Sequence, residues 1–174
     1  MRILVHPDGR LEAGSQIFRC ALGKGGISAA KREGDGATPV GCFAFRRVLY
    51  RPDRSGPPAT GLPVGPIDEA DGWCDDPADA AYNQPVRLPF APSHERLWRD
   101  DHLYDLIVII GHNDSPPVPF RGSAVFMHLA RPGWTPTEGC IALARPDLET
   151  LLALLAPGDE IEILAPETPA GGRE

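Results

Sequence analysis

The sequence predicts a single, mainly β domain with a few short helices, arranged as a β-sandwich or barrel. Two runs of branched apolar residues, over 103–110 and 124–129, have the length and composition of buried strands. Glycine and proline, with 19 and 20 residues in a chain of 174, divide the remainder into short segments separated by turns. A chain of this length suits one hydrophobic core and one domain.

Charge and composition exclude several classes of function. The chain has 17 basic and 24 acidic residues, a net charge of −7, and no basic stripe with interleaved aromatic residues, so nucleic acid is not an expected partner. No apolar run approaches the ~20 residues that span a membrane, so no membrane partner is expected either. The start at Met1–Pro7 lacks the apolar segment of an export signal. We therefore expect a cytoplasmic protein, or a periplasmic one if it uses an export route that the sequence does not display.

The four cysteines form no C-x-x-C pair, so we expect free thiols in a reducing compartment. A zinc site could in principle be built from two of them and two histidines, but their spacing resembles no known ligand pattern. We predict no metal and no cofactor. The residues considered for zinc are Cys74, His112, His128 and Cys140.

The first third of the chain predicts a hairpin, a loop and a strand. Residues 1–22 fit a β-hairpin with its turn at Pro7-Asp8-Gly9. Residues 23–41 are rich in glycine and charge and predict a loop. Residues 42–50 contain the aromatic and β-branched residues that favour a strand.

The middle segment, residues 51–92, is dominated by proline and glycine. A stretch of this length is unusual in a compact domain unless it has a function. Gly72–Asp76 and Ala81–Asn83 could line a cleft, although an ordered surface excursion held by Trp73 fits equally well. Residues 93–98 predict one helical turn capped by a serine.

The C-terminal part predicts a helix and a strand. Pro146 suits the first turn of a helix, and leucines recur at helical spacing until residue 155. Residues 159–164 alternate acidic and apolar side chains, as in a half-buried strand. We therefore place one domain over 1–164. Residues 165–174 offer nothing to bury and are predicted to be a disordered tail.

The chemistry is concentrated in a histidine near the end of the second apolar run and a cysteine that follows a glycine. Cysteine reacts as the thiolate, and a neighbouring imidazole is the usual group that takes its proton. Gly139 lets the backbone pass close to a substrate carbonyl, where the Cys140 N–H could bind an oxyanion. His128 alone could equally be a buried core histidine. Together with Cys140 it predicts a cysteine-dependent acyl-transfer enzyme.

These motifs resemble the L,D-transpeptidase catalytic domain, the YkuD family. His128 matches the family's first histidine, and Thr137-Glu138-Gly139-Cys140-Ile141 matches its cysteine motif. The segment Thr38-Pro39-Val40-Gly41-Cys42-Phe43 is similar to the family's upstream T-P-x-G-x-F segment, and the resemblance extends from about Gly34 to Ile163. Two positions differ, because Glu138 replaces a histidine and Ala142 replaces an arginine or asparagine.

The resemblance implies a YkuD-like β-sandwich or barrel that acts on peptidoglycan stem peptides. Such enzymes attack the amide of an L-centre, usually diaminopimelate, release the terminal D-Ala and form a thioester, which passes to water in L,D-carboxypeptidases or to an amine in L,D-transpeptidases. We favour an L,D-carboxypeptidase that hydrolyses tetrapeptide muropeptides during cell wall recycling, because no export signal is visible. The alternatives are a periplasmic L,D-transpeptidase that forms crosslinks and an inactive β-domain that binds peptides or glycans. The sequence does not predict an oligomeric state.

The site predicted from these considerations has a catalytic and a substrate-binding part. In the family, a backbone carbonyl just after the histidine orients the imidazole, a role that falls to Leu129. Glu138 would receive a substrate amine, and the arginines flanking the motif would bind carboxylates, unless they are solvated surface residues. The histidine that follows the buried strand is either near the cleft or structural. The predicted catalytic residues are Cys140, His128, Gly139 and Leu129, and the predicted substrate-binding residues are Glu138, Arg131, His112 and Arg145.

Overall fold

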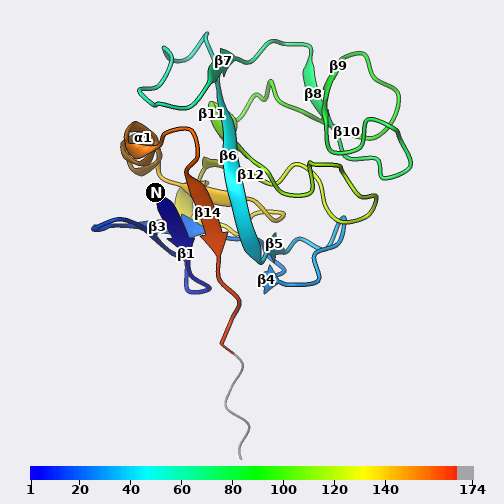
Figure 1. Ribbon diagram of the computed structural model, residues 1–174. Coiled ribbons are helices and arrows are strands. Elements are labelled where there is room, and N and C mark those ends of the chain that lie inside the picture. Colours follow the sequence, from blue (N-terminus) through cyan, green and yellow to red (C-terminus); the bar gives the residue numbers. More distant parts are fainter. Residues whose placement is uncertain (168–174) are drawn as a thin grey trace, which may run out of the picture.

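The computed structural model describes residues 1–167, which form a mainly β domain (Figure 1). The main sheet has nine strands in the order β11-β12-β13-β3-β2-β1-β14-β6-β7. An additional pairing between β11 and β6 closes this sheet into a ring that leaves out only β7. The predicted sandwich or barrel is therefore confirmed. The strands are β1 (Arg2–Val5), β2 (Arg10–Ala13), β3 (Gln16–Ala21), β6 (Gly41–Tyr50), β7 (Val64–Pro66), β11 (Leu106–Ile110), β12 (Phe126–Leu129), β13 (Ile141–Leu143) and β14 (Glu160–Ile163).

The ring closes because the long strand β6 pairs with two neighbours through different residues. Residues 41–44 pair with β14, and residues 45–50 pair with β11. The register to β11 shifts between Ile109 and Ile110, which marks an irregularity in the ladder. Figure 1 shows β6 as the long cyan strand that runs through the centre of the molecule.

Strand β11 is buried on both faces, which explains its unbroken run of apolar residues. Leu106, Val108 and Ile110 belong to the core inside the ring, whereas Ile107 and Ile109 belong to a second apolar cluster outside it. A strand with solvent on one face would instead alternate apolar and polar side chains. The sequence prediction for this strand is confirmed, although pairing begins only at Leu106.

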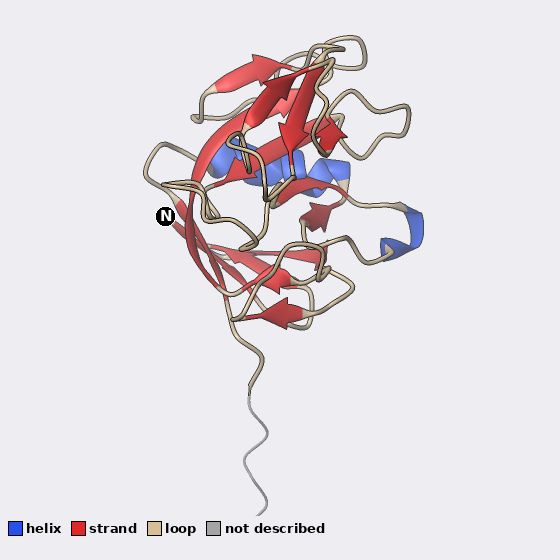
Figure 2. Cartoon of the chain, turned by 90° about the vertical axis from the view of Figure 1, so that its right-hand side faces the viewer, coloured by secondary structure: helices blue, strands red, loops and turns tan. Residues whose placement is uncertain are grey.

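The helix α1 (Arg145–Leu154) completes the inner core. It starts after an extended Ala144, has Pro146 in its first turn, and buries three leucines at helical spacing. Figure 2 shows α1 behind the strands in the middle of the molecule, and the short 3-10 helix η1 (Pro132–Trp134) at the right margin. Strand β14 follows the helix, so the predictions for both elements are confirmed. The buried leucines are Leu148, Leu151 and Leu152.

The N-terminal hairpin predicted for residues 1–22 is instead a three-stranded meander. The turn at Pro7–Gly9 joins β1 to β2 as expected, but a second turn at Gly14 and Ser15 starts β3. Gly14 has φ of +61°, which a glycine adopts without steric penalty. The loop over 23–41 contains the short parallel pair β4 (Ile27–Ser28) and β5 (Thr38–Pro39).

The proline-rich middle segment folds as a small sheet over the outer face of the ring. Strands β8 (Asp71–Cys74), β9 (Pro85–Arg87) and β10 (His94–Arg96) form this sheet, at the upper right in Figure 1. Trp73 of β8 packs edge-on against Phe126 with 5.0 Å between ring centroids. The helical turn predicted for 93–98 is wrong, because pairing of β10 with β8 satisfies the backbone there.

Of the predicted disordered tail, residues 168–174 lie outside the described residues. Within residues 1–167, no helix has the length and apolar character needed to cross a membrane.

Candidate active site

Strand alternation places the predicted histidine and cysteine on the same side of the sheet. On β12, Met127 and Leu129 point into the inner core, so His128 faces outwards. The parallel neighbour β13 sets Ala142 opposite His128. Cys140 lies two residues before Ala142 and belongs to the outer cluster, so its thiol and the imidazole share one face.

Both residues line a cleft with a volume of about 650 Å³. Its walls come from the loop before β5, the end of β8, the segment from β10 to β11, the residues before β12 and the cysteine motif. The cleft contains cations and carboxylates together, which suits a substrate that carries both charges. The charged residues that line it are Lys31, Glu33, Asp75, Glu95, Arg99, Arg131 and Glu138.

The Cys140 thiol is buried and held by the backbone of the strand beside it. Its S–H donates to the Ala124 carbonyl at 3.2 Å, and its sulfur accepts the Phe126 N–H at 3.4 Å. Burial raises the pKa of the Cys140 thiol to about 12, and the nearby Glu95 acts in the same direction. Within residues 1–167, neither hydrogen bond of the thiol goes to His128. The thiol is therefore protonated at neutral pH in this state.

The His128 imidazole is in the form that a general base needs. Its Nδ1 lies 2.9 Å from the Leu129 carbonyl, the contact that the resemblance implies. Because a carbonyl only accepts, Nδ1 carries the proton and Nε2 keeps its lone pair. Burial lowers the pKa of His128 to about 4, so the ring is neutral at pH 7. The base role of His128 stays a prediction.

The cysteine motif is packed against the glycine-rich loop that precedes β6. Gly139 has φ of +132°, and a Cβ at this position would lie 2.8 Å from the Ala37 carbonyl oxygen. Its N–H donates to Thr137 Oγ1 at 3.1 Å, and this hydroxyl donates to the Cys140 carbonyl at 2.6 Å. Glycine is therefore required here by both the backbone conformation and the close approach of the loop.

Two of the predicted substrate-binding residues line the cleft. Arg131 and Glu138 are both part of its wall. The Glu138 side chain is 76% exposed and pairs with Lys24 at 2.8 Å, so its charge is directed away from the buried thiol. The sequence alone does not identify Lys24 as the partner of Glu138, because the two residues are far apart along the chain.

The structure does not bring His112 and Arg145 to this cleft. His112 Nε2 lies 3.0 Å from the Arg121 carbonyl, and its ring packs edge-on against Phe43. Arg145 at the start of α1 forms an ion pair with the buried Asp105, with 3.1 Å between Nη2 and Oδ2. Both side chains have partners within the protein and lie outside the wall of this cleft, and a role of either one in substrate binding stays a prediction.

Sequence reasoning missed the residues that the small sheet and the loops contribute. The Tyr104 hydroxyl donates to Glu95 at 2.7 Å, and its ring packs edge-on against His128. Burial raises the pKa of both Tyr104 and Glu95. Charged residues look like surface residues in a sequence, and only Tyr104, inside the strand predicted over 103–110, carried a usable signal. The missed residues are Lys31, Glu95, Arg99 and Tyr104, whereas Asp75 belongs to the segment Gly72–Asp76, for which a place beside a cleft was one of two interpretations.

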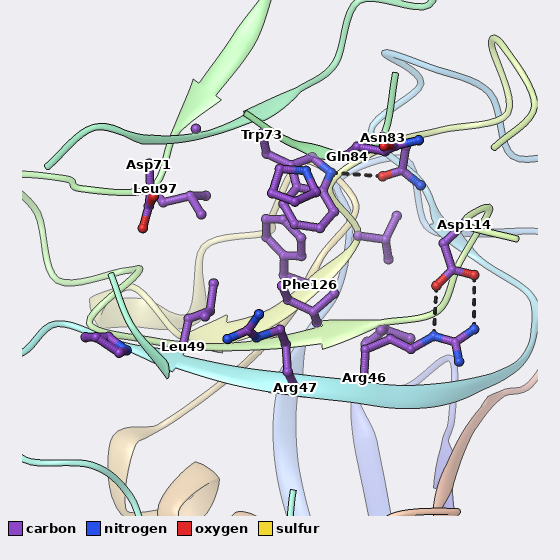
Figure 3. A pocket seen from close by; sticks show the side chains of 16 residues that line it. Arg46, Arg47, Leu49, Asp71, Trp73, Asn83, Gln84, Leu97, Asp114 and Phe126 are labelled. Carbon is purple, nitrogen blue, oxygen red and sulfur yellow. Dashed lines mark hydrogen bonds and ion pairs between the residues drawn. The ribbon is translucent and has the colours of Figure 1, made fainter. Parts of the chain in front are cut away.

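A second cavity of about 420 Å³ lies between β6 and the small sheet and contains neither Cys140 nor His128 (Figure 3). Figure 3 shows Trp73 above Phe126 in its wall, and the Trp73 Nε1–H donates to Asn83 at 3.0 Å. On its rim Arg46 forms a bidentate pair with Asp114. The residues Trp73 and Asn83, expected to line a cleft, therefore line this second cavity.

A model of the family described as L,D-transpeptidase catalytic domain, YkuD, matches residues 1–163. No curated protein matches the chain.

Three solved structures with a similar chain trace come from Campylobacter and Mycobacterium. The helical cell shape determining protein Pgp2 from Campylobacter jejuni is 14% identical with a TM-score of 0.48, over 96% of this chain and 48% of that one. L,D-transpeptidase 1 from Mycobacterium tuberculosis is 11% identical with a TM-score of 0.39, over 94% and 60% of the two chains. An L,D-transpeptidase from Mycobacterium smegmatis is 14% identical with a TM-score of 0.40, over 94% and 58%. The chain thus spans between 48% and 60% of the length of these proteins.

Proposed function

Because this chain belongs to the L,D-transpeptidase catalytic domain family, YkuD, we propose that it is an L,D-transpeptidase-type enzyme that acts on peptidoglycan stem peptides. The observation that carries the proposal is the cleft that Cys140 and His128 share on one face of β12 and β13. A thiol and a neutral imidazole beside an open cleft are the minimal parts of cysteine acyl transfer.

In the proposed reaction the substrate first displaces the thiol from the Ala124 carbonyl. His128 Nε2 takes the thiol proton while the Cys140 sulfur attacks the carbonyl carbon of the diaminopimelate L-centre. The carbonyl oxygen becomes an oxyanion, to which the Cys140 N–H donates, since the Gly139 N–H already bonds Thr137. The intermediate then collapses to a thioester: the C–N bond breaks, and the leaving amine of D-Ala takes the proton from His128.

Hydrolysis of this thioester is the outcome we favour, which makes the enzyme an L,D-carboxypeptidase of tetrapeptide muropeptides. Arg99 and Arg131 line the cleft, and the positive charge of each lowers the pKa of His128, so both guanidinium groups stand near the base. Asp101 holds the Arg99 guanidinium in a bidentate pair, so Arg131 is the group in this wall that suits a substrate with a free terminal carboxylate. Water attacks the thioester with His128 as base, and the sulfur leaves and regains a proton.

One observation favours the alternative, transfer to an amine that forms a crosslink. Asp75 and Glu95 both line the cleft, and Asp75 Oδ1 is buried without a hydrogen-bond partner in the described part of the chain. A buried carboxylate oxygen without a donor is a suitable partner for the ammonium group of an acyl acceptor. The two outcomes differ only in the nucleophile that resolves the thioester.

The experiment is incubation with a purified tetrapeptide muropeptide, with and without an excess of a second D-amino acid, followed by mass spectrometry. Loss of one D-Ala is expected, together with a thioester adduct on the intact protein that Cys140→Ala does not form. Exchange of D-Ala for the added amino acid would assign transpeptidation instead. No product with either acceptor, combined with peptide binding that Cys140→Ala retains, would leave a binding domain and overturn the proposal. Cytoplasmic localisation stays a prediction of the sequence, which fractionation of cells tests.

A further inference from the structure

Lys31 places a largely buried ammonium group in the wall of the catalytic cleft. Its side chain is 9% exposed and pairs with Asp35, four residues further along the same loop. Among residues 1–167, Asp35 is the only hydrogen-bond acceptor of Lys31 Nζ. An ammonium group has three donors, so two of them remain for groups that enter the cleft.

The ammonium lies beside the peptide that precedes the nucleophile. A Cβ built on Gly139 would lie 3.5 Å from Lys31 Nζ, and Cys140 is the next residue. Asp35, which holds Lys31, also accepts the Ala37 N–H at 2.8 Å. The Ala37 carbonyl in turn abuts Gly139, so the loop and the cysteine motif fix the ammonium relative to the thiol.

The reaction proposed above needs a positive charge at this place. The Cys140 sulfur is buried and has the carboxylate of Glu95 nearby, and both raise the pKa of its thiol. The charge of Lys31 acts in the opposite direction and lowers that pKa. In addition, the Gly139 N–H is taken by Thr137, which removes one backbone donor from the space where an oxyanion would form.

We propose that Lys31 is a catalytic residue whose ammonium group stabilises the negative charge that develops on the Cys140 sulfur and then on the carbonyl oxygen. The inference rests on the proposed acyl transfer. Lys31 keeps its proton throughout, and His128 remains the group that accepts and returns the thiol proton. A role confined to binding a substrate carboxylate would leave the reactivity of the free enzyme unchanged.

The first experiment follows the alkylation of Cys140 by iodoacetamide, a neutral probe, by peptide mass spectrometry between about pH 7 and 10. Lys31→Met is expected to slow the labelling of Cys140 about tenfold at each pH, since the thiolate fraction falls. Lys31→Gln, which can still donate to Asp35 but has no charge, should behave alike, whereas Lys31→Arg should keep most of the rate.

Lys24→Met is the matched control, because Lys24 pairs with the exposed Glu138 and does not line the cleft. It should leave the labelling of Cys140 unchanged. Equal labelling in the wild type and in both uncharged Lys31 variants would overturn the inference. Since this experiment needs no substrate, its result stands even if no stem peptide is turned over.

The second experiment measures kcat and KM with the peptide that the enzyme turns over. It separates an effect of Lys31 on catalysis from an effect on substrate binding. Lys31→Gln should lower kcat by about a hundredfold with little change in KM, as removal of an oxyanion-stabilising group does in comparable sites. A raised KM with unchanged kcat would assign Lys31 to ground-state binding and refute the catalytic role.

Discussion

The Tyr104 ring stands edge-on against the imidazole of His128, with 5.3 Å between the ring centroids, while its hydroxyl donates to Glu95 at 2.7 Å. The small sheet is thereby connected to the base of the proposed reaction, since Glu95 belongs to β10. With Nδ1 held by the Leu129 carbonyl and the Tyr104 ring packed against it, the imidazole has little freedom to rotate.

Substitutions of Tyr104 should separate its two contacts. Tyr104→Phe keeps the ring against His128 and loses only the hydroxyl, so we expect kcat to stay within a few-fold and stability to fall by about 1–2 kcal/mol. Tyr104→Ala removes the ring as well and should lower kcat at least tenfold more than Tyr104→Phe. Steady-state kinetics and urea unfolding measure both effects, and equal kcat values for the two variants would contradict the positioning role.

The pH dependence of turnover should reflect the low pKa of His128. A base must be unprotonated, and burial lowers the pKa of this imidazole to about 4. We therefore expect kcat/KM to show no loss from pH 7 down to about 5, and to fall only as the pH approaches 4. A pH–rate profile with a buffer control checks this. An acid limb centred near the ordinary histidine value of about 6.5 would contradict it.

The same pKa predicts a loss of stability in acid. Between about pH 6.5 and 4 the unfolded chain binds a proton at His128 that the folded chain excludes, so the free energy of unfolding falls as the pH is lowered through this window. For a shift to about 4 the contribution is roughly 3 kcal/mol. Urea unfolding at pH 7 and 4 should show that the free energy of unfolding falls less between these pH values in His128→Gln than in the wild type. Equal acid effects would show that other groups cause it.

Gly139→Ala should damage both stability and activity. The substitution combines a backbone conformation reserved for glycine with a contact of 2.8 Å to the Ala37 oxygen, and we expect a loss of about 3 kcal/mol or more. Gly14→Ala is the control, because Gly14 has a positive φ but no atom within 4 Å of the added Cβ, so only about 1 kcal/mol is expected. Similar losses in the two variants would show that the contact with Ala37 contributes nothing.

The two arginines flanking the cysteine motif should behave differently. Arg145 pairs with Asp105, which is 2% exposed and also contacts Arg54, so Arg145→Gln should lower stability by about 1 kcal/mol and leave KM unchanged. Arg131→Gln, in the cleft wall, should raise KM for a substrate with a free carboxylate and leave stability unchanged. A raised KM in Arg145→Gln would contradict this prediction and show that Arg145 contributes to substrate binding.

Elements with a strong local signal could be predicted from the sequence. The apolar run of β11, the helix with Pro146 in its first turn, and the alternating strand β14 follow from periodicity and propensity alone. The segment around Glu95 lacks such a signal. It is a strand because β8 offers it a pairing partner, and that partner is a tertiary feature.

The site divides in the same way. His128 and Cys140 could be found because their residue types and order indicate a chemistry, and strand alternation then places them on one face. Lys31, Asp75 and Glu95 come from three separate segments that meet only in the folded chain. Arg145 shows the reverse case: it is near Cys140 in the sequence, yet it pairs with the buried Asp105 and does not line the cleft.

The interior positions of β12 and β13 in the sheet bear on how a peptide can dock. Strands β12 and β13, which position the reacting groups, each have a hydrogen-bonded neighbour on both sides, so neither can accept an incoming peptide as an extra strand. Recognition by β-augmentation would demand a regular backbone of L-residues. An enzyme that binds its ligand through side chains does not need this regularity. It can bind a peptide whose main chain is made irregular by D-configured centres or branched linkages.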